Sequence, residues 1–218
     1  MIDLASLKKD AAGLVTVVAQ DRLTGEVRMV AHANVEALEQ TLASGAAHFF
    51  SRSRNALWKK GETSGHVMRV HEVWLDCDAD AVLYLVDPEG PTCHTGAPSC
   101  FITRVDAPAA SRAAPVFVRL EEALAARKQA TGEKSYTRSL LDAGAEKIGQ
   151  KLREEADELA RAIADEPSER VASEAADVIY HAMVGLLSRG VPLRSVEAEL
   201  ARRFGVSGHD EKASRARP

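Results

Sequence analysis

The sequence predicts two domains of different class, an α+β, mainly β domain at residues 1–108 and an all-α helical bundle at residues 116–206. Up to about residue 105, short β-type runs alternate with Gly, Pro and Asp, which is typical of strands joined by turns. Residues 106–115, DAPAASRAAP, are rich in Ala and Pro and lack periodicity, so we expect a linker there. From residue 116 onward, apolar residues recur with helical spacing.

Turn and cap residues define the elements of the first domain. The runs GLVTVVAQD and EVRMVAH predict two strands, and QDRLTGEV supplies a hairpin turn. The run NVEALEQTLASG predicts the one helix of this half, with Asn34 as its N-cap and Gly45 just past its end. We expect a further strand over AVLYLVDPEG.

Four helices are expected in the second domain. They cover VRLEEALAARKQA, LLDAGAEKIGQKLREEADELARAIA, SERVASEAADVIYHAMVGLLSRG and LRSVEAELARRF, with brief breaks between them. Four helices in about a hundred residues are typical of a small bundle.

Composition favours small-molecule chemistry. The chain has 218 residues, 45% of them hydrophobic and 28% charged, so it can bury an ordinary core. Its net charge of −4 leaves no basic footprint for nucleic acid or for an anionic membrane. The N-terminal segment looks like neither a signal peptide nor a membrane span, and three cysteines are an odd number for a disulfide framework. We therefore expect a cytoplasmic protein whose thiols are buried or bind a metal.

The stretch LDCDAD places three carboxylates two residues apart, at Asp76, Asp78 and Asp80, with Cys77 between the first two. If residues 70–78 are extended, Asp76 and Asp78 lie on one face of a strand and Cys77 on the other. Alternatively, DAD forms the turn between two strands, which brings the acids together without strict alternation. Carboxylate oxygens are hard ligands that suit Mg²⁺, and the competing interpretation is that the acids only cap a turn.

All three cysteines lie between residues 77 and 100. Cys77, Cys93 and Cys100 offer three soft thiolates, which suit Zn²⁺ and leave one position open for water. The alternative is that they are buried small hydrophobic residues. Cys93 and Cys100 lie in PTCHTGAPSC, a Pro- and Gly-containing loop with little core to fill. Beside a zinc-bound water, His94 is a candidate general acid or base.

A basic, glycine-containing segment, FFSRSRNALWKKGETSGH, begins with a β-type run. Hydroxyl groups, guanidinium groups and a flexible backbone can bind a phosphate, and an indole can stack on a base. The alternative is a solvated basic loop. The candidate substrate-binding residues of this segment are Ser51, Arg52, Ser53, Arg54, Trp58, Lys60, Glu62 and Ser64.

Together, SRSRNALWKKGETSGH, LDCDADAVLYLV and GPTCHTGAPSCF resemble phosphoribosyl-AMP cyclohydrolase of histidine biosynthesis, over about residues 12 to 104. The family opens the six-membered purine ring of phosphoribosyl-AMP by hydrolysis. The resemblance implies zinc on the three cysteines and magnesium on the three aspartates of LDCDAD. It also implies a homodimer whose zinc ligands come from both chains.

The helical half carries carboxylates at helical spacing. Lys151, Glu154, Glu155 and Glu158 fall at i, i+3, i+4 and i+7, within one stripe of a helix. Glu174, Asp177 and His181 likewise share one face of the next helix. If both faces meet, the clustered carboxylates require a cation, and hard oxygens select Mg²⁺ or Mn²⁺. The alternative is that these are solvated helix faces.

The segment from EKSYTRSLLDAG to LRSVEAEL resembles phosphoribosyl-ATP pyrophosphatase, one of the all-α nucleotide pyrophosphatases similar to MazG proteins, over about residues 117 to 204. Its signature, E-x-x-E followed by E-x-x-D, implies a magnesium site. The site residues implied are Glu155, Glu158, Glu174 and Asp177 with Glu154 as a further participant, and the phosphate neighbours are Lys147 and Lys151. The SYT run at residues 135–137 is a further candidate for substrate binding.

The two resemblances imply a bifunctional hydrolase. Its C-terminal domain converts phosphoribosyl-ATP to phosphoribosyl-AMP and pyrophosphate, and its N-terminal domain opens the adenine ring of that product. One alternative is a non-catalytic, zinc-stabilised domain fused to a helical dimerisation bundle. Another is a bundle that acts as a housecleaning pyrophosphatase on non-canonical nucleotides.

Overall fold

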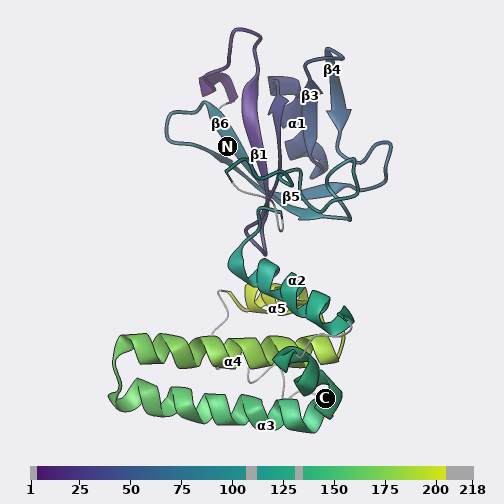
Figure 1. Ribbon diagram of the computed structural model, residues 1–218. Coiled ribbons are helices and arrows are strands. Elements are labelled where there is room, and N and C mark those ends of the chain that lie inside the picture. The colour runs from purple at the N-terminus through teal and green to yellow at the C-terminus, as the bar shows by residue number, and fades with distance from the viewer. Residues whose placement is uncertain (1–3, 107–111, 131–134, 205–218) are drawn as a thin grey trace, which may run out of the picture. The chain divides into compact units, whose positions relative to one another are not determined.

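The computed structural model describes residues 4–106, 112–130 and 135–204. The chain divides into two compact units, Met1–Pro115 and Val116–Pro218. The first unit is built mostly of strands and the second of helices, which confirms the two fold classes expected from the sequence (Figure 1).

One six-stranded sheet forms the first unit, after a short 3₁₀ helix, η1 (Leu4–Ser6). Its strands lie in the order β4-β3-β2-β1-β6-β5. Among the described strands, only the neighbours β1 and β6 pair in parallel, and every other neighbouring pair is antiparallel. The strands are β1 (Val15–Asp21), β2 (Val27–Ala33), β3 (His48–Ser51), β4 (Ala56–Lys59), β5 (Met68–Leu75) and β6 (Ala81–Pro88).

Helix α1 (Val35–Ser44) packs against β3 and contacts the adjacent strands β2 and β4. The Asn34 side chain accepts a hydrogen bond from the Ala37 N–H, and Gly45 ends the helix in the left-handed conformation, as expected from the sequence. The hydroxyl of Thr41 donates to the Ala37 carbonyl and accepts from Tyr84 of β6, so the helix is joined to the centre of the sheet.

Alternating apolar residues of the central strands form the core of this unit. Val17 and Ala19 of β1 lie with Val82 and Tyr84 of β6 in one buried cluster. Phe49 of β3 joins it, with its ring centroid 5.8 Å from that of Tyr84. In β6, Val82, Tyr84 and Val86 are buried, and the alternating Ala81, Leu83 and Leu85 are half-buried, so hydrophobic residues occupy both faces of this strand.

The strand expected over residues 70–78 ends earlier than the sequence indicated. β5 stops at Leu75, and residues 76–80 turn the chain into β6. Ala79 has φ of 63°, which strict strand alternation does not allow. The assignment of Asp76 and Asp78 to one strand face is therefore wrong, and the alternative in which DAD forms a turn is confirmed.

The described residues of the second unit form four helices, as expected. They are α2 (Val116–Gln129), α3 (Tyr136–Asp165), α4 (Ser168–Ser188) and α5 (Leu193–Arg203). The long helices α3 and α4 lie side by side and make the main contact of the unit (Figure 1). The core of this unit contains Leu124 of α2 together with Leu140, Ile148, Met183 and Val184 of α3 and α4.

Helix α3 is interrupted at Gly144, where φ is 84° and ψ is −179°. This backbone conformation is almost exclusive to glycine. The interruption separates the first two turns of α3, which carry Tyr136, from the longer segment that carries the carboxylates.

Tyr84 predicts a specific pH dependence of stability. Burial raises the pKa of its phenol to about 12. Because the folded pKa lies above the unfolded value, the neutral phenol contributes fully below pH 10 and its contribution is lost as the pH rises to 12. The loss amounts to roughly 2 to 3 kcal/mol.

The measurement compares urea unfolding of the natural chain with that of Tyr84→Phe between pH 8 and 12. Both tryptophans, Trp58 and Trp74, belong to the first unit, so tryptophan fluorescence reports on this unit. We expect the free energy of unfolding of the natural chain, relative to that of Tyr84→Phe, to be constant up to pH 10 and to fall above it. Parallel curves over the whole range would contradict this role of Tyr84.

Candidate functional site

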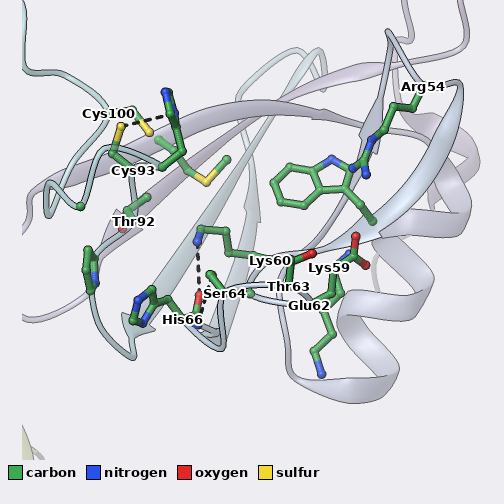
Figure 2. Close-up of a pocket in the computed structure, with 16 residues that line it drawn as sticks. Arg54, Lys59, Lys60, Glu62, Thr63, Ser64, His66, Thr92, Cys93 and Cys100 are labelled. Carbon is green, nitrogen blue, oxygen red and sulfur yellow. Dashed lines mark hydrogen bonds between the residues drawn. The ribbon is translucent and has the colours of Figure 1, made fainter.

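A pocket of about 500 Å³ lies in the first unit. Three segments line it: Met29 on β2, the run from Arg54 to His66, and the loop from Pro91 to Cys100. In the view of Figure 2, Cys93 and Cys100 lie at one side of the pocket and Arg54 at the opposite side. The pocket thus joins the two sequence segments that carry the thiols and the basic residues.

The cysteine loop, residues 91–100, is fixed on β2 by backbone hydrogen bonds. The Cys100 N–H donates to the Arg28 carbonyl at 2.8 Å. The buried Ser99 hydroxyl donates to the Val27 carbonyl, also at 2.8 Å. Within the loop, the Cys93 N–H donates to the Ala97 carbonyl. These bonds aim both thiols into one end of the pocket.

The two thiols differ in their electrostatics. Hydrogen bonds from Thr95 lower the pKa of Cys93 and so favour its thiolate. Burial raises the pKa of Cys100. The His94 ring lies beside Cys93, with Nδ1 3.8 Å from Sγ. A thiolate is the form that binds zinc, so this pair fits two ligands of a zinc ion.

Cys77 lies apart from this pair. It is exposed in the turn between β5 and β6 and does not line the pocket. Within the described residues, Cys77, Cys93 and Cys100 do not gather into one group of ligand atoms within 4.8 Å. One chain therefore offers two of the three expected zinc ligands at a single place.

The three aspartates do come together in that turn. Ligand oxygens of Asp76, Asp78 and Asp80 lie within 4.8 Å of one another, and all three residues are exposed. Asp76 accepts hydrogen bonds from the N–H groups of Asp80 and Ala81, and the latter bond lowers the pKa of Asp76. The hydrogen bond to Asp76 raises the pKa of Asp80. An ordered turn of three carboxylates fits a hard cation such as Mg²⁺.

Lys60 is the most buried basic group of the pocket, with 7% of the residue exposed. Its Nζ donates to the His66 carbonyl at 3.2 Å (Figure 2). Burial lowers the pKa of Lys60, and the negative charges of Cys100 and Cys93 act against this shift. Lys60 therefore couples the basic segment electrostatically to the thiol pair.

His66 is a pocket residue that sequence reasoning did not select. It ends the run GETSGH, and its place in the pocket depends on two glycines. A Cβ on Gly61 would come within 2.6 Å of the His66 backbone, and one on Gly90 would come within 2.5 Å of its Nδ1. The spacing of Gly61 to His66 was visible in the sequence, but the approach of Gly90 was not.

The other residues predicted in the basic segment are divided between two cavities. Arg54, Trp58, Glu62 and Ser64 line the main pocket with Lys60 and His94. Ser51 and Arg52 line a neighbouring cavity of about 360 Å³, which shares Arg54 and Trp58 with it. Ser53 lines neither of these two cavities.

In the helical unit, Glu155 and Glu158 of α3 meet Glu174 of α4. Their ligand oxygens lie within 4.8 Å of one another. Glu174 is only 3% exposed, which is rare for a carboxylate, and Arg170 forms an ion pair with it. Clustered carboxylates at a helix–helix contact fit a divalent cation.

Glu154 and Asp177 lie outside this group of three. Lys151 bridges Glu154 and Glu155, at 2.8 and 3.0 Å, and lowers the pKa of Glu154. Asp177 is exposed. Lys147 is exposed as well, and its ammonium donates to Gln150.

Tyr136 is placed near the carboxylates by a chain of hydrogen bonds. Nδ1 of the buried His181 lies 2.9 Å from the Asp177 carbonyl, and Nε2 lies 3.0 Å from the Tyr136 hydroxyl. A carbonyl only accepts, so Nδ1 carries a proton and, in a neutral ring, Nε2 accepts from the phenol. Burial raises the pKa of Tyr136, which keeps the phenol neutral.

Two family models match the chain, one in each unit. The model described as Phosphoribosyl-AMP cyclohydrolase matches residues 29–102. The model described as Phosphoribosyl-ATP pyrophosphohydrolase matches residues 117–204. The fold, the two sites and these matches define a two-domain hydrolase with one candidate active site in each domain.

Curated relatives match across both domains. The Histidine biosynthesis bifunctional protein HisIE of Wolinella succinogenes is 45% identical over 212 residues, 93% of each chain. That of Aquifex aeolicus is 42% identical and covers 92% of this chain and 100% of its own. The chloroplastic protein of Arabidopsis thaliana is 43% identical, over 98% of this chain and 80% of its own. The chain belongs to this family of bifunctional histidine biosynthesis proteins.

It is therefore a bifunctional enzyme of histidine biosynthesis, with the cyclohydrolase domain before the pyrophosphatase domain. The expectation drawn from the two resemblances is confirmed. These relatives support neither the alternative of a non-catalytic protein nor that of a housecleaning pyrophosphatase. Over the residues that the structure describes, no helix combines the length and apolarity needed to cross a membrane. The cytoplasmic location stays a prediction.

Gly90→Ala tests the position of His66. The new methyl group would displace the imidazole ring, and we expect ring opening to fall about 10- to 100-fold because a small displacement in an active site has a large effect on rate. Pyrophosphate release is expected to be unchanged. Gly13→Ala is the matched control, because Gly13 also has positive φ but has open space where a Cβ would lie. Equal effects of both substitutions on ring opening would contradict the role of His66.

Proposed function

We propose that ring opening takes place in the main pocket of the first unit, at a zinc ion held by Cys93, Cys100 and the Cys77 of a second chain. The observation that carries this proposal is the separation of the three thiols. Cys93 and Cys100 share a loop at the pocket, whereas Cys77 is exposed in another turn. A homodimer can supply the third ligand, and three protein ligands leave the fourth position open, as catalytic zinc requires.

The chain's own residues have separate tasks in this pocket. A zinc ion held by these thiolates would lower the pKa of water to about 7 and so would supply a nucleophile at neutral pH. His94, beside Cys93, is placed to accept or donate a proton during ring opening. The Trp58 indole offers a face for the adenine ring, and Arg54 offers a guanidinium to the phosphate. Lys60 adds positive charge near the thiolates.

Asp76, Asp78 and Asp80 are proposed to hold a magnesium ion. Support comes from their convergence in a turn whose backbone N–H groups fix Asp76. The raised pKa of Asp80 reflects a carboxylate held against another acid, and a divalent cation would relieve that repulsion.

In the helical unit we propose a magnesium site on Glu155, Glu158 and Glu174, completed by Glu154 and Asp177, in a MazG-like arrangement of helices. The cation would neutralise the triphosphate of phosphoribosyl-ATP and orient the attacking water. Lys147 and Lys151 lie on α3, the helix of Glu154, Glu155 and Glu158, where they can contact phosphate oxygens. The product, phosphoribosyl-AMP, is then the substrate of the first domain.

Single substitutions are expected to separate the two activities. Cys93→Ser removes a zinc ligand, so ring opening should fall on the order of 100-fold or more while pyrophosphate release persists. Glu155→Gln removes a carboxylate from the helical cluster and should have the reverse effect of similar size. Each variant is assayed for pyrophosphate release from phosphoribosyl-ATP and for ring opening of phosphoribosyl-AMP.

Glu199→Gln is the matched control for the acid substitution. Glu199 forms an ion pair with Arg202 on α5, and its carboxylate is not part of the cluster. Both activities should be retained. If Glu155→Gln still released pyrophosphate at the normal rate, the magnesium site would have to lie elsewhere.

Mixing two inactive variants tests the shared zinc site. Cys77→Ser and Cys93→Ser chains, unfolded together and refolded, form mixed dimers in which one of the two sites has all three cysteines. Random pairing should therefore restore about a quarter of the natural ring-opening activity. If all three ligands came from one chain, mixing would restore nothing.

A further inference from the structure

A buried ion network lies beneath the cysteine loop. Asp21 at the end of β1 and Glu26 in the following turn are 0% and 1% exposed. Arg28 of β2 pairs with both, at 2.6 Å to Asp21 and 2.9 Å to Glu26. Two carboxylates thus share one guanidinium in a place where uncompensated charge is costly.

Arg112 supplies the second positive charge. Its guanidinium contacts the Glu26 carboxylate, and its side chain is nearly buried. With it, the network contains two acids and two bases and is neutral. Arg112 lies in the linker, outside both matched segments, residues 29–102 and 117–204. The neighbouring Ala113 N–H donates to the Phe101 carbonyl, so the linker is hydrogen-bonded to the chain directly after Cys100.

Arg28 connects this network to the thiols. Its Nη1 donates to the Pro98 carbonyl at 3.1 Å, and its own carbonyl accepts from the Cys100 N–H at 2.8 Å. The same residue therefore holds the cysteine loop with its side chain and with its main chain. Any shift of Arg28 moves the segment that carries Cys100.

We propose that Arg112 is a positioning residue for the cysteine loop. Its charge satisfies Glu26, so that Arg28 remains placed to hold Asp21 and Pro98. Without Arg112, Glu26 and Asp21 compete for Arg28, and the Pro98 carbonyl loses its donor. The inference rests on the proposed zinc site, because a loop held less firmly binds metal less tightly when its ligands must be ordered on binding.

The test measures zinc retention by the full-length chain. Arg112→Met keeps much of the side-chain volume and removes the charge. We expect zinc release to an excess of chelator, followed with a colorimetric indicator, to be about tenfold faster than in the natural chain. Arg112→Lys keeps the charge and should restore most of the retention. Pyrophosphate release should be unchanged in both variants.

A charge-balanced variant separates electrostatics from loss of packing. In Glu26→Gln/Arg112→Met, one acid and one base are removed together, so Asp21 and Arg28 remain as a neutral pair. We expect zinc release to return to within about threefold of the natural rate. If Arg112→Met alone does not fold, the double variant should fold and retain zinc, and its failure to do so overturns the proposal. Arg104→Met is the control for loss of an arginine near the linker, because Arg104 pairs with Asp106 at the exposed surface.

A metal-free measurement distinguishes failure of this inference from failure of the proposed zinc site. Alkylation of Cys100 in the metal-free chain, followed by mass spectrometry, should be faster in Arg112→Met, while alkylation of Cys77 should not change. If Cys93→Ser retains zinc as well as the natural chain, the zinc assignment is wrong, and faster Cys100 alkylation still supports the role of Arg112. If Arg112→Met releases zinc and is alkylated at Cys100 at the same rates as the natural chain, the proposed role of Arg112 is wrong.

Discussion

Like charges held close together, and the groups that neutralise them, determine how both domains are built. Asp21 and Glu26 can be buried because Arg28 and Arg112 pair with them, and Glu174 because Arg170 reaches it. The acids of residues 76–80 differ from these buried acids because they are exposed to solvent. A cation from solution can reach that turn, whereas the network around Glu26 is closed by the chain itself.

The two candidate metal sites of the first domain lie at opposite ends of the β-sheet. The turn after β5 gathers the aspartates, and β2 carries the cysteine loop through Val27 and Arg28. Strands β1 and β6 lie between β2 and β5 in the sheet and so separate these two places within one chain. This separation explains why Cys77, two residues after β5, does not join Cys93 and Cys100.

Local signals in the sequence predicted most elements, and long-range contacts account for what was missed. Asn34 begins α1 through its side-chain oxygen and Gly45 ends it through its backbone N–H and positive φ, so residue types alone identified both ends. The sequence placed the end of β5 beyond Leu75 because the alternation of residue types continues into the following turn. The pairing of Arg112 with Glu26 joins residues far apart in the chain and leaves no local pattern. The approach of Gly90 to His66 is hidden for the same reason.

The interruption of α3 at Gly144 gives the helical domain a mechanical property. A continuous helix would transmit any tilt of its first turns directly to the carboxylates. Here the segment before Gly144 can tilt about that single residue. Its N-terminal end is held by the hydrogen bonds between Tyr136 and His181 and between Thr137 and Tyr180. The distance between the phenol and the acids is therefore set by side chains of α4, so the stiffness of this site is a property of two helices and not of α3 alone.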